Sequence, residues 1–238
     1  MWLRSGFIGA VLLGTLAGVA AAQEPASGTQ PGDRVEMLKQ SFVASKTALR
    51  QYEWIETVAM SLSGEEKVRQ QFTCYYGADG ALQKVPVAAD AKEAQKRGVR
   101  GKVADNKKAE IQASLKSATA LLALYVPLDP AKIQAAKAAG NVSVSLPGAD
   151  GSVTVTIKNY LKPGDEVAAR VDAAKNTLQA VTISTFDDSG KEKSPVTGNV
   201  TYAALGDGTL FPAKQALGIS SQNLKIDVQN SGYRKRAQ

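Results

Sequence analysis

The chain has 238 residues, one cysteine and no histidine, and its formal net charge is +7. Without histidine it cannot build a Ser-His-Asp or Cys-His arrangement, and it lacks the commonest metal ligand. One cysteine cannot build a cysteine-rich zinc site or a CxxC redox pair. Adjacent carboxylates occur at Glu65–Glu66 and Asp187–Asp188, but in predicted turns, where such residues are normally solvated. We therefore expect a protein that is not an enzyme and uses no cofactor and no metal.

Residues 1–22 have the pattern of a secretory signal peptide. Arg4 supplies the positive charge, an apolar stretch runs from Gly6 to Ala22, and three alanines end it before Gln23. The alternative is a retained membrane anchor, but a stretch this short and this rich in Ala and Gly is at the lower limit for spanning a bilayer. We expect cleavage after Ala22 and a mature protein located in the periplasm.

The N-terminal half of the mature chain predicts a linker, a helix and three strands. Residues 23–32 are a linker by composition. Apolar residues at helical spacing predict a helix over 33–52, with Asp33 as its cap. The period then changes to alternation, which predicts antiparallel strands at 53–62, 67–76 and 81–87.

One face of these three strands is predicted to be apolar. A hairpin that turns about Glu65 pairs Val58 with Phe72 and Glu56 with Cys74, and paired residues share a face. Glu56 and Gln70 interrupt this face. They lie either at a rim or bulge of the sheet, or at a mouth where the polar end of a ligand meets water. The apolar members are Trp54, Val58, Met60, Leu62, Val68, Phe72, Cys74, Tyr76, Val85 and Val87.

The single cysteine, Cys74, has four possible roles: nucleophile, metal ligand, half of an intermolecular disulfide, or buried wall residue. A nucleophilic thiol needs a neighbouring cation to lower its pKa. The predicted neighbour of Cys74 is instead Glu56, which raises the pKa of a thiol. We therefore favour the wall residue.

A basic insert is predicted at residues 88–108, and within its part 92–108 seven Lys and Arg face only two acidic residues. Its weak periodicity indicates a flexible crossover. It is either a solvated loop or a contact for an anionic membrane or polymer. Nucleic acid is not expected as a partner, because the basic clusters lack interleaved aromatic residues. The candidate contact residues are Lys96, Arg97, Arg100 and Lys102.

The C-terminal half predicts two helices followed by strands. The helices cover 111–126 and 128–141, the second with Asp129 as cap, Pro130 in its first turn and Gly140 at its exit. Alternation separated by hairpin connectors then continues to the end of the chain. The predicted strands lie at 141–147, 152–161, 165–172, 178–185, 198–205, 209–219 and 223–233.

About ten strands in hairpin runs must curl, because a flat sheet of that size leaves unprotected edges. The helices then cover the concave apolar side. The predicted fold class is α+β, a curled antiparallel sheet (incomplete β-barrel) with helices covering the concave side. Residues 33–238 form a single domain in this interpretation, and we expect a monomer.

The order of elements resembles that of the periplasmic lipoprotein-carrier (LolA/LolB-like) superfamily. The resemblance is carried by the hairpin run YEWIETVAMSLSGEEKVRQQFTCYYGADGALQKV, the helical pair, and the closing segment GTLFPAKQALGISSQNLKIDVQNSGYRK. It implies an incomplete barrel with helices as a lid over an apolar cavity for acyl chains. A lipid or an acylated protein is then the expected partner.

The apolar face and the first helix supply candidate cavity residues. The same residues could instead fill a core, which would make the protein an envelope scaffold that contacts a membrane surface or another envelope protein. A cavity of several hundred cubic ångströms would indicate a carrier. The candidates are Trp54, Val58, Met60, Phe72 and Tyr76 on the sheet and Leu121, Leu122 and Tyr125 on the helix.

Overall fold

The computed structural model describes residues 43–87, 99–125, 129–175, 177–188 and 192–236. The predicted signal peptide, the linker and residues 88–98 of the basic insert lie outside these ranges. Of the helix predicted at 33–52, the described residues 43–48 are helical and continue into a 3-10 turn, η1 (Leu49–Gln51).

Ten strands form one antiparallel sheet in the described part of the chain, in the order β3-β2-β1-β10-β9-β8-β7-β6-β5-β4. Each of the ten predicted strands is present. They are β1 (Tyr52–Leu62), β2 (Glu65–Tyr76), β3 (Leu82–Pro86), β4 (Val142–Val144), β5 (Ser152–Lys158), β6 (Glu166–Asp172), β7 (Thr177–Asp187), β8 (Ser194–Ala204), β9 (Leu210–Ile219) and β10 (Leu224–Lys235).

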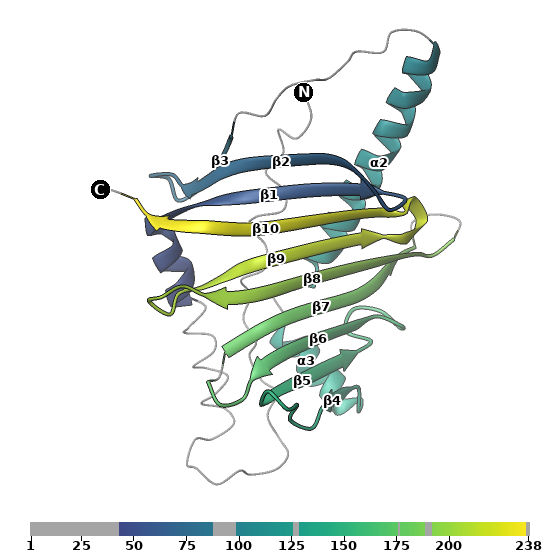
Figure 1. Ribbon diagram of the computed structural model, residues 1–238. Coiled ribbons are helices and arrows are strands. Elements are labelled where there is room, and N and C mark those ends of the chain that lie inside the picture. The colour runs from purple at the N-terminus through teal and green to yellow at the C-terminus, as the bar shows by residue number, and fades with distance from the viewer. Residues whose placement is uncertain (1–42, 88–98, 126–128, 176, 189–191, 237–238) are drawn as a thin grey trace.

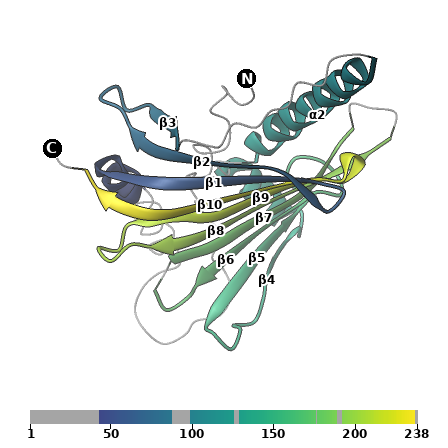
Figure 2. The same ribbon diagram turned by 45° about the horizontal axis from the view of Figure 1, so that its top comes forward.

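The sheet curls without closing, because its edge strands β3 and β4 do not pair with each other. Strands β4 to β10 follow one another as a meander, and β10 then pairs with β1, which brings the two ends of the described chain together. Helices α2 (Val99–Ala123) and α3 (Pro130–Ala138) connect β3 to β4. Figure 1 shows both helices behind the curled sheet, and Figure 2 shows α2 beside the sheet from a second direction. The predicted fold class is confirmed.

Register shifts occur at several places where the sheet bends. They interrupt the β1–β10 pair after Glu53, the β1–β2 pair after Met60, the β6–β7 pair after Arg170 and the β8–β9 pair after Thr201. An extra residue in one strand increases the local twist. These irregularities therefore help the sheet to curl.

The first hairpin turns earlier than predicted, which changes each pairing partner on β2 by two residues. Its central residues, Ser63 and Gly64, both have positive φ, at 52° and 82°, as a tight two-residue turn requires. Trp54 therefore pairs with Cys74, and Glu56 pairs with Phe72 instead of Cys74. A shift of two residues leaves each side chain on its predicted face, so the apolar face of β1 and β2 has the residues that were predicted for it.

The prediction for the second hairpin was wrong by one residue. Gly80, with φ +73°, takes a left-handed position in a loop closed by the Gly77 N–H and the Ala81 carbonyl. Cys74 then pairs with Lys84, and Thr73 pairs with Val85. A one-residue shift turns every side chain to the other face. Val85 is consequently 48% and Val87 39% exposed, and Lys84 lies on the face assigned to them.

Helix α2 begins at Val99, whereas the sequence predicted a flexible crossover to residue 108 and a helix from Ile111. Residues 99–110 are rich in Lys, Ala and other good helix formers but have no apolar stripe, so the periodicity did not detect them. The second helix was predicted correctly. The Asp129 side chain accepts a hydrogen bond from the Ala131 N–H at 2.9 Å, and Gly140 leaves the helix with φ +72°. Among the described residues, no helix is both long and apolar enough to cross a membrane.

Candidate functional site

One part of the concave face, over strands β5 to β8, is filled by its own side chains. Ile157, Val167 and Ile183 belong to a buried apolar cluster that includes Tyr125 and Ile133 from the helical segment. Tyr125 and Ile133 are both 0% exposed. This filled half of the concave face is therefore an ordinary packed core.

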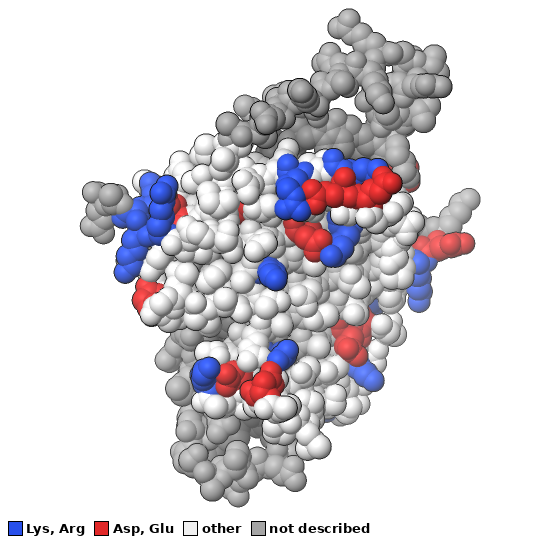
Figure 3. Space-filling model, viewed as in Figure 1, with Lys and Arg blue, Asp and Glu red and all other residues white. Residues whose placement is uncertain are grey.

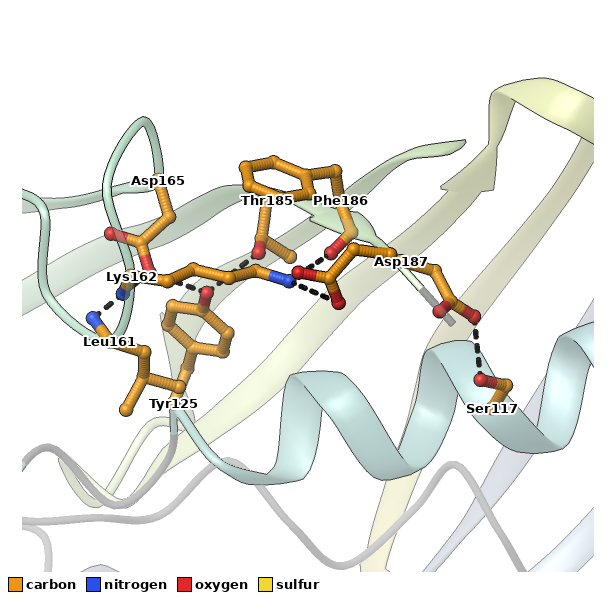
Figure 4. A network of polar contacts seen from close by, with 9 residues as sticks. Ser117, Tyr125, Leu161, Lys162, Asp165, Thr185, Phe186 and Asp187 are labelled. Carbon is orange, nitrogen blue, oxygen red and sulfur yellow. Dashed lines mark hydrogen bonds and ion pairs between the residues drawn. The ribbon is translucent and has the colours of Figure 1, made fainter. Parts of the chain in front are cut away.

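A buried polar network holds Tyr125 at the end of helix α2 (Figure 4). The Tyr125 hydroxyl lies 2.6 Å from Asp165 Oδ2 and 2.6 Å from Thr185 Oγ1. Burial and the hydrogen bond to the Asp165 carboxylate raise the pKa of Tyr125, so its hydroxyl remains protonated and donates. The sequence placed Tyr125 in the wall of a cavity, and the structure places it in the filled half.

The Asp165 carboxylate also organises the loop before β6. It accepts hydrogen bonds from the backbone N–H groups of Tyr160, Leu161 and Lys162 at 2.6, 2.9 and 3.0 Å. A second attachment lies further back along helix α2, where the Ser117 hydroxyl is 2.7 Å from Asp187 Oδ2. Helix α2 is thus fastened to the sheet by polar contacts at its C-terminal end.

The other part of the concave face, on strands β1 and β2, carries apolar side chains that are only partly buried. Val58 and Met60 pack at the margin of a second cluster, which α2 forms with β9 and β10, and Leu121 and Leu122 pack there too. Phe72 lies on the same face of β2 and is also partly buried. The structure thus brings four predicted cavity residues together beside α2, with Phe72 on the neighbouring strand.

Leu122 approaches the sheet closely because residue 198 is glycine. A Cβ atom at Gly198 would lie only 3.0 Å from Leu122 Cδ1. Real Cβ atoms rarely come so near, so a larger residue would require the Leu122 side chain or helix α2 to move by a few tenths of an ångström. The glycine therefore allows Leu122 to pack directly on strand β8.

The remaining two predicted residues, Trp54 and Tyr76, lie in an aromatic cluster at the other end of β1. The Trp54 ring is 5.9 Å from that of Tyr76 and stacks on that of Tyr233 at 5.3 Å. Tyr233 also contacts Phe211, with 4.3 Å between the ring centroids. Trp54 is buried and Tyr76 partly buried.

Simple alternation along β10 would turn Tyr233 away from Trp54. The β1–β10 register shifts opposite Trp54, and Gly232 there has φ +63°. A glycine in this conformation is typical of a bulge that adds one residue to a strand. The sequence analysis therefore missed Tyr233, although the glycine inside the strand was a signal for it.

A buried ion pair lies next to this cluster. Glu56 Oε1 is 2.6 Å from Lys84 Nζ, and the Glu56 side chain is 1% exposed against 16% for Lys84. Glu56 is thus not at an exposed rim. Lys84 was missed because the second hairpin was predicted in the wrong register.

Cys74 is fully buried between Trp54 and Lys84 on the neighbouring strands. Burial first, and the charge of Glu56 second, raise the pKa of the Cys74 thiol to about 12. A neutral, shielded thiol is a poor nucleophile. The position and protonation of Cys74 agree with its prediction as a wall residue.

The four predicted contacts for an anionic surface stay predictions. Lys96 and Arg97 lie outside the described residues. Arg100 and Lys102 fall in the first turns of α2, and their side chains are not among those described. At the C-terminus, Arg236 donates to the Tyr76 carbonyl at 2.9 Å and lies over the Tyr75 ring.

A hollow of about 640 Å³ lies on the opposite, convex face of the sheet, away from every predicted site residue. Small side chains at Ala168 and Ala180 form part of its lining, and Arg170, Thr182 and Asn199 are also among its lining residues. Figure 3 shows this face, where charged side chains gather mainly toward the periphery. Among the described residues, no group of three or more His, Cys, Asp or Glu could hold a metal ion.

Comparison with known proteins gives matches in structure only. No protein-family model matches the chain, and no curated protein does. A LolA superfamily protein from Nitrosomonas europaea is similar with a TM-score of 0.35 and 9% identity, over 84% of this chain and 94% of that one. A putative outer membrane lipoprotein-sorting protein domain from Vibrio parahaemolyticus is similar with a TM-score of 0.33 and 9% identity, over 82% and 91%.

Proposed function

We propose that this protein binds a hydrophobic ligand, such as an acyl chain, a lipid or an acylated protein, as a periplasmic carrier or sensor. The ligand would lie against the inner face of β1 and β2, between Phe72 and helix α2. The observation that carries the proposal is the incomplete burial of Val58, Met60 and Phe72 on a face whose other half is filled. Large apolar side chains left partly open on a concave surface are typical of binding sites.

The proposed activity is binding and not catalysis. The chain has no histidine, and its one thiol is buried with its pKa raised to about 12. Helix α2 is well placed as a cover, since Leu115, Leu121 and Leu122 are themselves only partly buried. In this proposal the protein is a monomer, and its basic segment contacts a membrane surface.

A second candidate is an envelope scaffold with a filled core. It is favoured by the complete burial of Tyr125 and Ile133 in the filled half. A scaffold would carry no lipid when isolated, so one experiment separates the two candidates.

The test is native mass spectrometry of the mature protein, purified from the periplasm without detergent. We expect bound species with the mass of a lipid or an acyl-peptide. These species should be absent in Phe72→Asp, because this substitution puts a charge on the open face. The matched control is Gln71→Asp, because Gln71 is the next residue on β2 and is exposed on the other face. An apo mass that is unchanged after incubation with phosphatidylethanolamine and phosphatidylglycerol vesicles would overturn the proposal and favour the scaffold.

A further inference from the structure

Four buried polar atoms on the concave face have no hydrogen-bond partner. They are Trp54 Nε1, Glu56 Oε2, Gln215 Nε2 and Asn230 Oδ1, and each belongs to a residue that is at most 8% exposed. Buried polar atoms are almost always hydrogen-bonded, so a group of exceptions calls for an explanation. One isolated exception could reflect local strain, but four neighbours point to a shared missing partner.

Strand register places these four residues along one diagonal of the concave face. Glu56 on β1 is paired with Asn230 on β10, and Trp54 is two positions from Glu56 on the same strand. Gln215 on β9 is paired with Val228, the position two before Asn230. Residues two apart on a strand share a face, and paired residues are direct neighbours across it. The four residues therefore form a polar patch that runs diagonally across β9, β10 and β1, with Glu56 and Asn230 at its centre and Trp54 and Gln215 at its two ends.

The patch borders the open half of the concave face. Phe72 is the partner of Glu56 on strand β2. Val58 follows two positions after Glu56 on the same face and is only partly buried. An acyl chain lying over Val58 and Phe72 would thus have its end at the polar patch.

The patch offers two hydrogen-bond donors and two acceptors to a ligand. Trp54 Nε1 and Gln215 Nε2 are donors, whereas Glu56 Oε2 and Asn230 Oδ1 are acceptors. The Asn230 amide is oriented by its Nδ2 group, which donates to the Pro212 carbonyl at 2.8 Å. The charge of Glu56 is already neutralised by Lys84 at 2.6 Å. A ligand group must therefore both donate and accept, and it needs no net charge.

We propose that this patch binds the polar end of the hydrophobic ligand and selects a neutral group with donors and acceptors, a hydroxyl or a primary amide. A carboxylate offers acceptors only and leaves Glu56 and Asn230 without donors. An ammonium offers donors only and leaves Trp54 and Gln215 without acceptors. This inference rests on the proposed function, because it names the head of the ligand whose chain lies on the open half.

The experiment compares four ligands with the same fourteen-carbon chain length: monomyristoylglycerol, myristamide, myristate and tetradecylammonium. The measurement is the displacement of the fluorescent probe N-phenyl-1-naphthylamine from the mature protein by each ligand. Each ligand is used below its own critical micelle concentration. A site built to hydrogen-bond a group rejects analogues that lack it, so the two neutral ligands should bind about tenfold tighter or more than the two charged ones. Gln215→Leu should reduce this preference several-fold and leave chain binding intact.

The matched control is Gln179→Leu. Gln179 Oε1 is also buried without a partner, but it lies on β7 beside the convex hollow, so its loss should leave the preference unchanged. Trp54→Phe is a second test variant, which removes the N–H and keeps an aromatic ring.

The outcomes separate the two proposals. Equal binding of all four ligands, abolished by Phe72→Asp, would overturn the polar patch and leave the proposed function standing. Tightest binding of myristate, or an unchanged preference in both Gln215→Leu and Trp54→Phe, would also overturn the patch. Failure of the probe and of every ligand to bind would overturn the proposed function and the patch with it.

Discussion

The two halves of the concave face differ in how completely their own side chains are buried and hydrogen-bonded. In the filled half, the Tyr125 hydroxyl is hydrogen-bonded to both Asp165 and Thr185, and the apolar residues around it are buried. In the open half, Val58 and Met60 are partly exposed, and neighbouring polar atoms lack partners. The difference teaches that one curled sheet can combine a fully packed core, which supplies stability, with a region whose apolar side chains are only partly buried and whose polar atoms lack partners.

The largest expected contrast is between two truncations to alanine, one in each half. Ile183→Ala removes a buried side chain, 3% exposed, from the filled half, and should lower the free energy of unfolding by about 4 kcal/mol. Met60→Ala, in the open half, should cost about 2 kcal/mol, because a partly exposed side chain loses less on truncation. Urea denaturation measures both. Equal costs would show that the open half is packed as tightly as the filled one.

The polar anchor of the filled half gives the next effect. Asp165→Ala leaves three backbone N–H groups without their acceptor and removes one of the two hydrogen-bond partners of the Tyr125 hydroxyl. It should lower the free energy of unfolding by about 3 kcal/mol. Asp227→Ala is the control, because the ion pair of Asp227 with Lys225 is exposed, and it should change stability by at most about 0.5 kcal/mol. A comparable loss in both variants would contradict the anchoring role of Asp165.

The close approach of α2 to β8 gives a smaller effect. Gly198→Ala places a Cβ atom 3.0 Å from Leu122 Cδ1, and should cost about 1 kcal/mol because the Leu122 side chain or the helix must shift. In Gly206→Ala the added Cβ meets nothing within 4 Å, so this control should be neutral or slightly stabilising. Thermal unfolding compares the two. A stabilised Gly198→Ala would show that α2 moves outward freely, as a loose lid would.

The smallest effect concerns pH. The pKa of the folded Cys74 thiol is about 12, whereas its ordinary value is 9.0. Above pH 9 the unfolded chain loses this proton while the folded protein keeps it, so stability falls as pH rises. Cys74→Ala should lack this part of the alkaline loss, which parallel urea titrations at pH 8 and pH 10 would reveal. Identical pH slopes in the two proteins would contradict the shielded thiol.

Local patterns were sufficient for the strands, for helix α3 and for the apolar face of β1 and β2. Alternation located the ten strands, and the sequence Asp129-Pro130 located the start of α3. Alternation also placed Val58, Met60 and Phe72 on the concave face, because a strand side chain faces the same side as its second neighbour whatever the partner strand.

Pairing between strands decided what local patterns could not. The positive φ of Ser63 and Gly80 set the two hairpin registers, and these registers brought Lys84, instead of Val85, next to Glu56. The bulge at Gly232 turned Tyr233 inward in the same way. Each depends on one backbone conformation that changes the face or partner of every residue beyond it.

The sequence by itself therefore determined the α+β class, the strand inventory and the apolar character of the concave face, because these follow from periodicity along the chain. The tertiary structure alone decided which half of that face is filled and which four polar atoms lie together beside the open half. Both depend on residues that are far apart in the sequence. The pairing of β10 with β1 brings Glu56 next to Asn230, and the packing of α2 on the sheet brings Tyr125 next to Thr185.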